Sequence, residues 1–261
     1  MIKPTILCLI AGQRAGTTAL RSALGATGAF FNHGEIFHTE DCKPGAFLPF
    51  ARERAIQVSD LATYERAQDV TEDYLAHLAS VAGGKIPLID VKLNSWHVLR
   101  PFWAYIHQQP FFLQALIRRR AAFVFLRRED LVEQVLSEQV ARHASKWHNL
   151  TEGDLPNRIT VDVLAVANQA RLIVEGENFL IQFLRALDTF VAMSYEDLFV
   201  DGCVNSRLLG RLGDMFERDI PATVTPKIQK NQGDKRQIVA NYSEAEEAIR
   251  AVVSQCGRPA L

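Results

Sequence analysis

The stretch Thr5-Ile-Leu-Cys-Leu-Ile-Ala11, continued by Gly12-Gln-Arg-Ala-Gly-Thr-Thr18 and Ala19-Leu-Arg-Ser-Ala-Leu24, determines the fold. The short apolar run predicts a buried strand, the glycine-containing segment predicts a tight turn, and the last segment predicts a helix. Backbone N–H groups converge in such a turn, and the helix dipole adds positive potential. The stretch therefore predicts an anion-binding site between a strand and a helix.

The rest of the chain alternates between strand-like and helix-like segments. Further strands are expected over 28–31, 86–93, 121–126 and 190–195. Helices are expected over 71–81, 130–144, 160–187, 204–216 and 243–254, with short helices between 96 and 120. The segment after the second strand, which contains Pro44, Gly45 and Pro49, is expected to be a loop.

This alternation predicts an α/β fold, a P-loop-like three-layer arrangement with a central parallel sheet flanked by helices. Residues 1–261 contain no evident linker or repeat, so a single domain is expected. Ligands bind such sheets at the carboxyl ends of the strands. Residues 12–18, 92–94 and 127–128 follow three of the expected strands, so we expect them to meet there.

Composition limits the class of protein. The 261 residues are 48% hydrophobic and 23% charged, which is typical of a globular protein, and the net charge of −1 argues against general nucleic-acid binding. No apolar run is long enough for a membrane span, and the first strand begins too early to leave room for a signal peptide, so a cytoplasmic protein is expected. The four cysteines are widely spaced and are expected to be unpaired thiols.

The turn differs from the phosphate loop of nucleotide kinases. That loop has the pattern GxxxxGK[ST]. Here Gly12 and Gly16 are one residue too close, and Thr17 replaces the lysine. A P-loop kinase that binds a nucleoside triphosphate with Mg²⁺ is therefore the less favoured alternative. The cation lies inside the turn instead, as Arg14.

The segment Arg14-Ala-Gly-Thr-Thr18 resembles the 5′-phosphosulfate loop of sulfotransferases that use 3′-phosphoadenosine 5′-phosphosulfate (PAPS). The resemblance implies that Ala15, Gly16, Thr17 and Thr18 hold the 5′-phosphosulfate. It also implies that Arg14 neutralises charge on the bridging oxygen, together with Lys92 from a neighbouring strand end. These enzymes need no metal, and PAPS is their co-substrate.

A second motif, Leu126-Arg-Arg-Glu-Asp-Leu-Val-Glu-Gln-Val-Leu-Ser137, has the form LRRxDxxxQxxS. It resembles the bacterial carbohydrate sulfotransferases that act on trehalose or nodulation factors. The resemblance implies that Arg128 and Ser137 hold the 3′-phosphate, with Arg127 as the alternative arginine. An arginine side chain can bind a phosphate with two hydrogen bonds, and a serine on the facing helix can add another. In other sulfotransferases the arginine lies eight residues before the serine, a position that Glu129 occupies here.

Three later segments extend the resemblance. They are Asp90-Val-Lys-Leu-Asn94, Met193-Ser-Tyr-Glu-Asp-Leu198 and Lys230-Asn-Gln-Gly-Asp-Lys235, the last within a basic segment at 227–236 whose role is open.

Asp130 is expected to cap the helix after the second motif, with Glu133 three residues on.

A base must take the proton of the acceptor hydroxyl. Glu35 is the candidate that the resemblance to the trehalose and nodulation-factor enzymes implies, and His33 and His38 are the alternatives. The expected partner is a small molecule or glycan with a hydroxyl, on a carbohydrate or glycolipid, although segments 38–70 and 145–160 carry no decodable acceptor signature. A homodimer through the long helix from Thr160 is possible. A nucleotide-binding protein without turnover is the competing hypothesis from another class.

Overall fold

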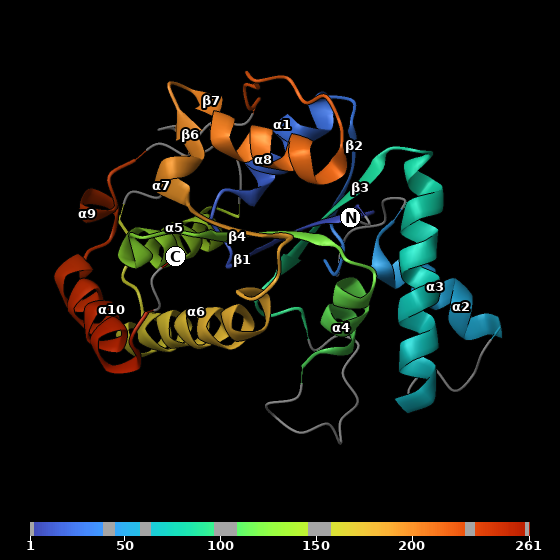
Figure 1. Ribbon diagram of the computed structural model, residues 1–261. Helices are drawn as coiled ribbons and strands as arrows, with labels where there is room; N and C mark the ends of the chain where they lie inside the picture. Colours follow the sequence, from blue (N-terminus) through green and yellow to red (C-terminus); the bar gives the residue numbers. More distant parts are fainter. Residues whose placement is uncertain are drawn as a thin grey trace.

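The computed structural model describes residues 3–38, 45–57, 64–96, 109–145, 158–227, 233–258 and 261. A five-stranded parallel sheet lies at its centre, in the order β2-β3-β1-β4-β5 (Figure 1). The strands are β1 (Leu7–Ala11), β2 (Phe30–Glu35), β3 (Ile86–Lys92), β4 (Ala122–Arg127) and β5 (Phe190–Ser194). A small antiparallel pair, β6 (Phe199–Val200) and β7 (Cys203–Val204), stands apart. The α/β fold with a central parallel sheet is thus confirmed.

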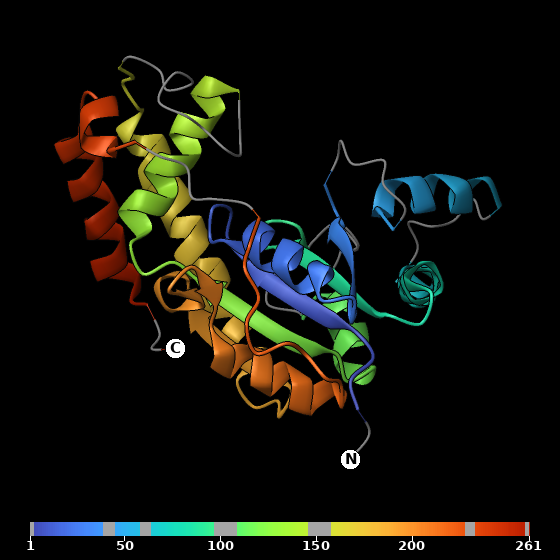
Figure 2. The ribbon, with the colours of Figure 1, turned by 90° about the horizontal axis from the view of Figure 1, so that it is seen from above.

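Helices cover both faces of the sheet (Figures 1 and 2). One face carries α1 (Thr17–Ala26) and α8 (Ser206–Phe216), and the other carries α3 (Tyr64–Ala82), α4 (Phe111–Arg118) and part of α6 (Val163–Leu184). Helix α5 (Leu131–Ala144) and α10 (Tyr242–Cys256) pack with α6 beyond the carboxyl edge. The remaining helices are α2 (Phe47–Gln57), α7 (Tyr195–Leu198) and α9 (Lys235–Ile238).

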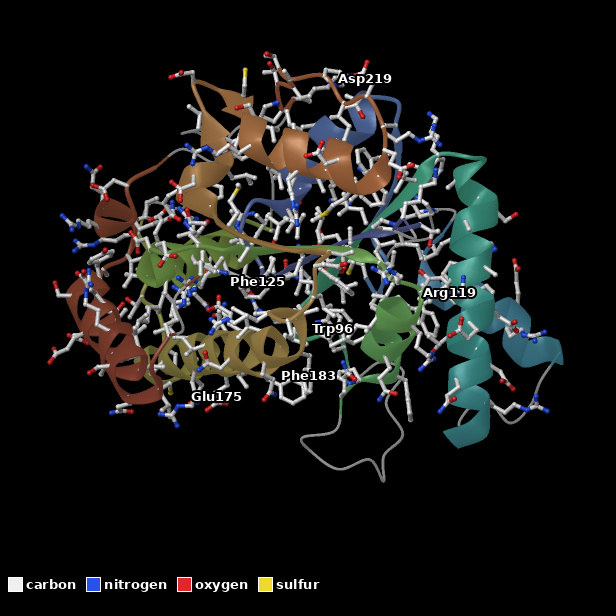
Figure 3. All side chains as sticks on the ribbon, in the orientation of Figure 1. Trp96, Arg119, Phe125, Glu175, Phe183 and Asp219 are labelled. Atoms are coloured by element: carbon white, nitrogen blue, oxygen red, sulfur yellow. The ribbon has the colours of Figure 1, made fainter. Side chains whose placement is uncertain are left out.

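Successive residues of the central strands contribute to different core clusters. In β1, Leu7, Leu9 and Ala11 pack under α1 and α8, whereas Cys8 and Ile10 pack toward α3 and α4. Parallel strands buried on both faces are apolar throughout for this reason. Figure 3 shows the second face, where Trp96, Phe125 and Phe183 lie between the sheet, α4 and α6. A rigid two-sided core therefore supports the carboxyl edge where the strands end.

Two sequence expectations around the second strand are wrong. Strand β2 is later and longer than 28–31, because residues 32–35 pair with β3 through a bulge between Asn32 and Gly34. Helix α2 occupies part of the expected loop, because Phe47 is buried against the ring of Tyr74 and Pro49 falls in the first helical turn, where proline is tolerated.

Smaller differences concern boundaries and short elements. Helix α3 begins at Tyr64 rather than residue 71, and α7, α9 and the β6–β7 pair were not expected. Gly83 and Gly84 follow the end of α3, both with positive φ. Asp130 caps α5 by accepting the Glu133 N–H at 2.9 Å, as the sequence predicts. Among the described helices, none combines the length and apolarity that crossing a membrane requires.

Candidate functional site

Three strand ends meet beside the turn after β1. Ala11, the last residue of β1, is in register with Lys92 of β3 on one side and Leu126 of β4 on the other. The expected convergence of residues 12–18, 92–94 and 127–128 is therefore confirmed.

The turn itself depends on Gly16. Its φ of 86° is left-handed, and a Cβ atom built there would lie 2.6 Å from the Tyr195 ring. Glycine is thus required both by conformation and by the close approach of α7. No acidic residue occupies the first turn of α1, and no described side chain caps that helix at Gly16. The N-terminus of α1 is therefore an electropositive position with Thr17 buried at its start.

Lys92 lies at this N-terminus in a buried ion pair. Its Nζ donates to both carboxylate oxygens of Asp90, at 3.0 and 2.9 Å, and to the hydroxyl of Thr17. Arg21 of α1 approaches the same carboxylate at 3.7 Å. Asp90 is fully buried and Lys92 is 3% exposed. Two cations therefore share the Asp90 carboxylate on this side of the turn.

Arg14 lies on the other side of the turn, against α5. Its Nε donates to Ser137 Oγ at 3.2 Å. Burial lowers the pKa of Arg14, and the positive charge of Arg128 lowers it further. Gln134, one helical turn before Ser137, donates to the backbone carbonyl of Gln13 at 2.7 Å and fastens the turn to α5. Arg14 thus contacts Ser137 of α5, and Arg128 lies 3.5 Å from Glu133, one helical turn before Ser137 on the same helix.

Arg127 and Arg128 have different surroundings. Arg128 lies with its guanidinium carbon 4.9 Å from the Tyr195 ring centroid, and its buried Nε has no hydrogen-bond partner among the residues that the structure describes. Arg127 instead donates two hydrogen bonds to Glu129 Oε1, at 3.1 and 2.6 Å. Side chains alternate along a strand. Arg127, the last residue of β4, therefore lies on the same face of the sheet as Phe125, whereas Arg128 follows the strand end and lies against Tyr195.

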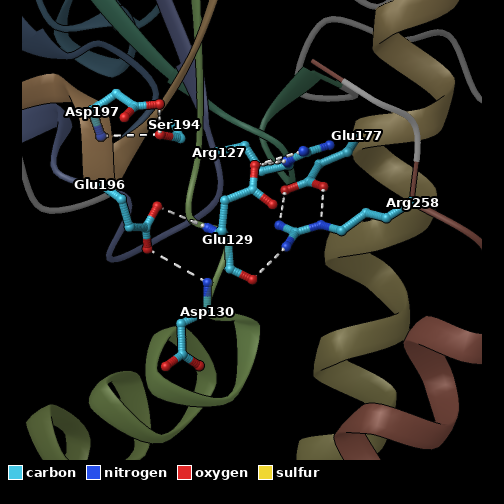
Figure 4. Close-up of polar contacts among 8 residues, drawn as sticks. All are labelled: Arg127, Glu129, Asp130, Glu177, Ser194, Glu196, Asp197 and Arg258. Atoms are coloured by element: carbon cyan, nitrogen blue, oxygen red, sulfur yellow. Dashed lines mark hydrogen bonds and ion pairs between the residues drawn. The ribbon is translucent and has the colours of Figure 1, made fainter.

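Figure 4 shows the polar network around residues 127–130, the segment that leads from β4 to α5. Arg258, beyond α10, forms a two-pronged pair with Glu177 of α6 at 2.7 and 2.8 Å and also donates to the Glu129 carbonyl at 3.2 Å. Burial raises the pKa of Glu177, although Arg258 opposes the shift. Glu196 accepts from the backbone N–H of Glu129 at 3.0 Å. The segment at residues 127–130 is therefore held by Arg258, which follows α10, and by Glu196 of α7.

The candidate base Glu35 is the last residue of β2 rather than part of a loop. Its Oε1 accepts a hydrogen bond from Gln13 Nε2 of the turn at 3.1 Å, and it pairs in register with Asp90. Glu35 is therefore beside the same turn as Lys92. His33 is 1% exposed, with its ring packed on Gly45 and Phe31. His38 is exposed and follows the strand end by three residues.

The C-terminal segment contributes one buried cation. Lys235, at the start of α9, donates to the Gly233 carbonyl at 2.9 Å and lies 3.5 Å from the Glu133 carboxylate. Residues 228–232 of the basic segment lie outside the described residues, as do 39–44, 58–63 and 146–157 in the proposed acceptor segments. Within the described part of the chain, no group of three or more His, Cys, Asp or Glu side chains is arranged to hold a metal ion.

Sequence reasoning missed several residues that shape the site. They are Gln13, Asp90, Glu133 and Tyr195, which contact Glu35, Lys92, Arg128 and Gly16 respectively. The quoted motifs contain all four, but their roles depend on contacts between segments distant in sequence. A signal was present for Asp90, because an acidic residue two positions before Lys92 shares its face of a strand.

Solved structures of sulfotransferases are similar to the chain. The sulfotransferase domain from the curacin biosynthetic pathway matches with 16% identity and a TM-score of 0.49, over 99% of each chain. The sulfotransferase domain from the Synechococcus PCC 7002 olefin synthase matches with 13% identity and a TM-score of 0.47, over 100% of this chain and 98% of that one. Sulfotransferase STF9 from Mycobacterium avium matches with 14% identity and a TM-score of 0.42, over 99% and 70%. No family profile and no curated protein matches the chain. At these similarities, function has to be inferred from the side chains of the site.

Proposed function

We propose that this chain is a sulfotransferase that moves the sulfuryl group of PAPS to an acceptor hydroxyl. The observation that carries the proposal is the pair of cationic positions flanking one turn. Lys92 lies at the N-terminus of α1, and Arg128 lies with Arg14 and Ser137 on the α5 side. A nucleotide with anionic groups at both its 5′ and 3′ ends needs two such positions. The phosphates of a nucleoside triphosphate form one chain and need only one.

The buried Nε–H of Arg128 is a donor that a 3′-phosphate oxygen could accept from. Leaving a buried donor without a partner costs about 1–3 kcal/mol, and a phosphate oxygen would remove that cost. Arg127 fits the role less well, because its guanidinium already binds Glu129. We therefore assign Arg128 and Ser137 to the 3′-phosphate.

The 5′ end would be held by the turn. Backbone N–H groups of Ala15 to Thr18 and the Thr17 and Thr18 hydroxyls suit the phosphosulfate. Lys92 would neutralise charge that grows on the bridging oxygen, and Arg14 would contribute from the α5 side. In the reaction one S–O bond to the phosphate breaks and one S–O bond to the acceptor forms, leaving adenosine 3′,5′-bisphosphate.

Glu35 is proposed as the base that takes the acceptor proton. Its hydrogen bond from Gln13 holds the carboxylate beside the turn, within the same strand-end edge as Lys92. The acceptor would be a small molecule or glycan hydroxyl, on a carbohydrate or glycolipid, which a screen with labelled donor can identify. Glu35→Gln is expected to abolish transfer while donor binding is kept. Retained transfer would move the base to His33 or His38.

Calorimetry with two nucleotides tests the donor assignment. Adenosine 3′,5′-bisphosphate should bind better than 5′-AMP, and Arg128→Met or Ser137→Ala should reduce that preference. One charge-assisted hydrogen bond contributes about 1.5–3 kcal/mol, which corresponds to roughly 10- to 150-fold in affinity. Arg127→Met is the matched control and should leave the preference unchanged.

Equal affinity for the two nucleotides would contradict the assignment, and tighter Mg²⁺-dependent binding of ATP would favour the kinase alternative. Strong bisphosphate binding without transfer to any acceptor would favour a nucleotide-binding protein.

A further inference from the structure

One carboxylate lies between two of the buried cations at the α5 side of the turn. Glu133 Oε1 is 3.5 Å from Arg128 Nη2 and also 3.5 Å from Lys235 Nζ. Arg128 and Lys235 are 6% and 3% exposed, so both need a counter-charge. They come from segments more than a hundred residues apart, and Glu133 joins them.

These contacts are longer than charge-assisted hydrogen bonds, which span about 2.7–2.9 Å. Glu133 therefore balances the two charges without fitting either cation closely. Its negative charge also acts on Arg14 and raises the pKa of that group, in opposition to the effects of burial and of Arg128. The Glu133 side chain is 25% exposed, so it has an open side toward solvent.

We propose that Glu133 is an internal counter-ion that stands in for the 3′-phosphate and limits how tightly the nucleotide is held. This inference rests on the proposed function. In the free protein its carboxylate keeps Arg128 and Lys235 together against their mutual repulsion. A phosphate dianion brought to the same cations either displaces the carboxylate or stays beside it. Both cases cost binding energy, the first through lost ion pairs and the second through like-charge repulsion.

The consequence is a faster release of adenosine 3′,5′-bisphosphate. A product with a 3′-phosphate dissociates more readily when the Glu133 carboxylate can pair with Arg128 and Lys235 in its place. Glu133 is thus a residue that sets nucleotide affinity, and it need not touch the reacting atoms.

Glu133→Gln tests the inference, because it keeps the shape of the side chain and removes the charge. Adenosine 3′,5′-bisphosphate should bind at least about fivefold tighter, the lower limit for two unit charges 4 Å apart in water. Its dissociation rate in stopped-flow measurements should fall, while the affinity for 5′-AMP changes by a smaller factor. Glu129→Gln is the matched control, because the Glu129 carboxylate binds Arg127 instead, and it should change neither affinity.

Unchanged or weaker bisphosphate binding in Glu133→Gln would overturn the inference, since Glu133 would then only position Arg128. Titration with inorganic phosphate, followed by thermal unfolding, separates this failure from failure of the proposed function. If the wild type shows no preference for the bisphosphate but Glu133→Gln gains affinity for phosphate, the function is wrong and the counter-ion role stands. If phosphate stabilises both proteins equally, the counter-ion role is wrong.

Discussion

Asp90→Asn is expected to destabilise the protein more than any exposed charge substitution. Asp90 is fully buried, accepts two hydrogen bonds from Lys92 and lies 3.7 Å from Arg21. Asparagine has almost the same shape, but it leaves two cations without their carboxylate. Removing one partner of a buried ion pair costs about 3–5 kcal/mol. For a chain of this size that lowers Tm by roughly 6–20 °C.

Thermal unfolding of four proteins measures this cost: wild type, Asp90→Asn, Lys92→Met and the double variant. The double variant should lose less stability than the two single variants together, because it leaves no uncompensated charge at position 92. Asp69→Asn, in the exposed pair with Arg66, is the control and should cost about 0–1 kcal/mol. Strictly additive effects, or single variants that unfold within about 2 °C of the wild type, would refute the reasoning.

Three further variants test other parts of the site and its scaffold. Gly16→Ala should cost about 1–3 kcal/mol in urea unfolding, because φ is positive there and the new Cβ would meet the Tyr195 ring; an unchanged midpoint would show that the turn relaxes freely. Gln134→Leu should cost up to about 1–3 kcal/mol, since it leaves the half-buried Gln13 carbonyl of the turn without its donor; a neutral result would mean that water replaces the amide. Burial raises the pKa of Glu72, but hydrogen bonds from two arginines at the end of α4 outweigh it and hold the pKa below its usual value. Its stabilisation is therefore present above about pH 4.5 and is lost as the pH falls through the lower folded-state pKa, so the Tm difference between wild type and Glu72→Gln should shrink in acid and must not grow.

The central strands could be predicted from sequence because both faces of each are buried. The apolar runs around Ile10, Ile89 and Val124 are too short for typical helices, and the strands appear where they were expected. The first and last residues of strand β2 could not be predicted in this way. Its second half, from Asn32 to Glu35, is polar and is extended only because β3 pairs with it. Helix α2 could not be predicted because proline is common both in turns and in the first turn of a helix, where Pro49 lies.

The roles of individual site residues stay predictions: Glu35 as the base, and Arg14, Lys92 and Arg128 as ligands of the nucleotide. The cytoplasmic location, the homodimer and a single domain over residues 1–261 also stay predictions. The local patterns nevertheless bring these side chains to one edge. Strand ends in a parallel sheet must lie side by side once their order is known, and the motifs at residues 12–18, 92–94 and 127–128 were each placed at such an end.

The sequence alone predicted the turn at residues 12–18 between a buried strand and a helix start, and the structure has β1 and α1 on either side of it. Only the tertiary structure decided which arginine faces that turn. Arg127 and Arg128 are neighbours with the same chemistry, but Arg127 ends β4 and binds Glu129, whereas Arg128 lies just beyond the strand, against the Tyr195 ring and 3.5 Å from Glu133. Only the folded chain could likewise pair Lys92 with Thr17 and set Glu133 between Arg128 and Lys235. Contacts of this kind join residues that no local pattern relates, so packing alone establishes them.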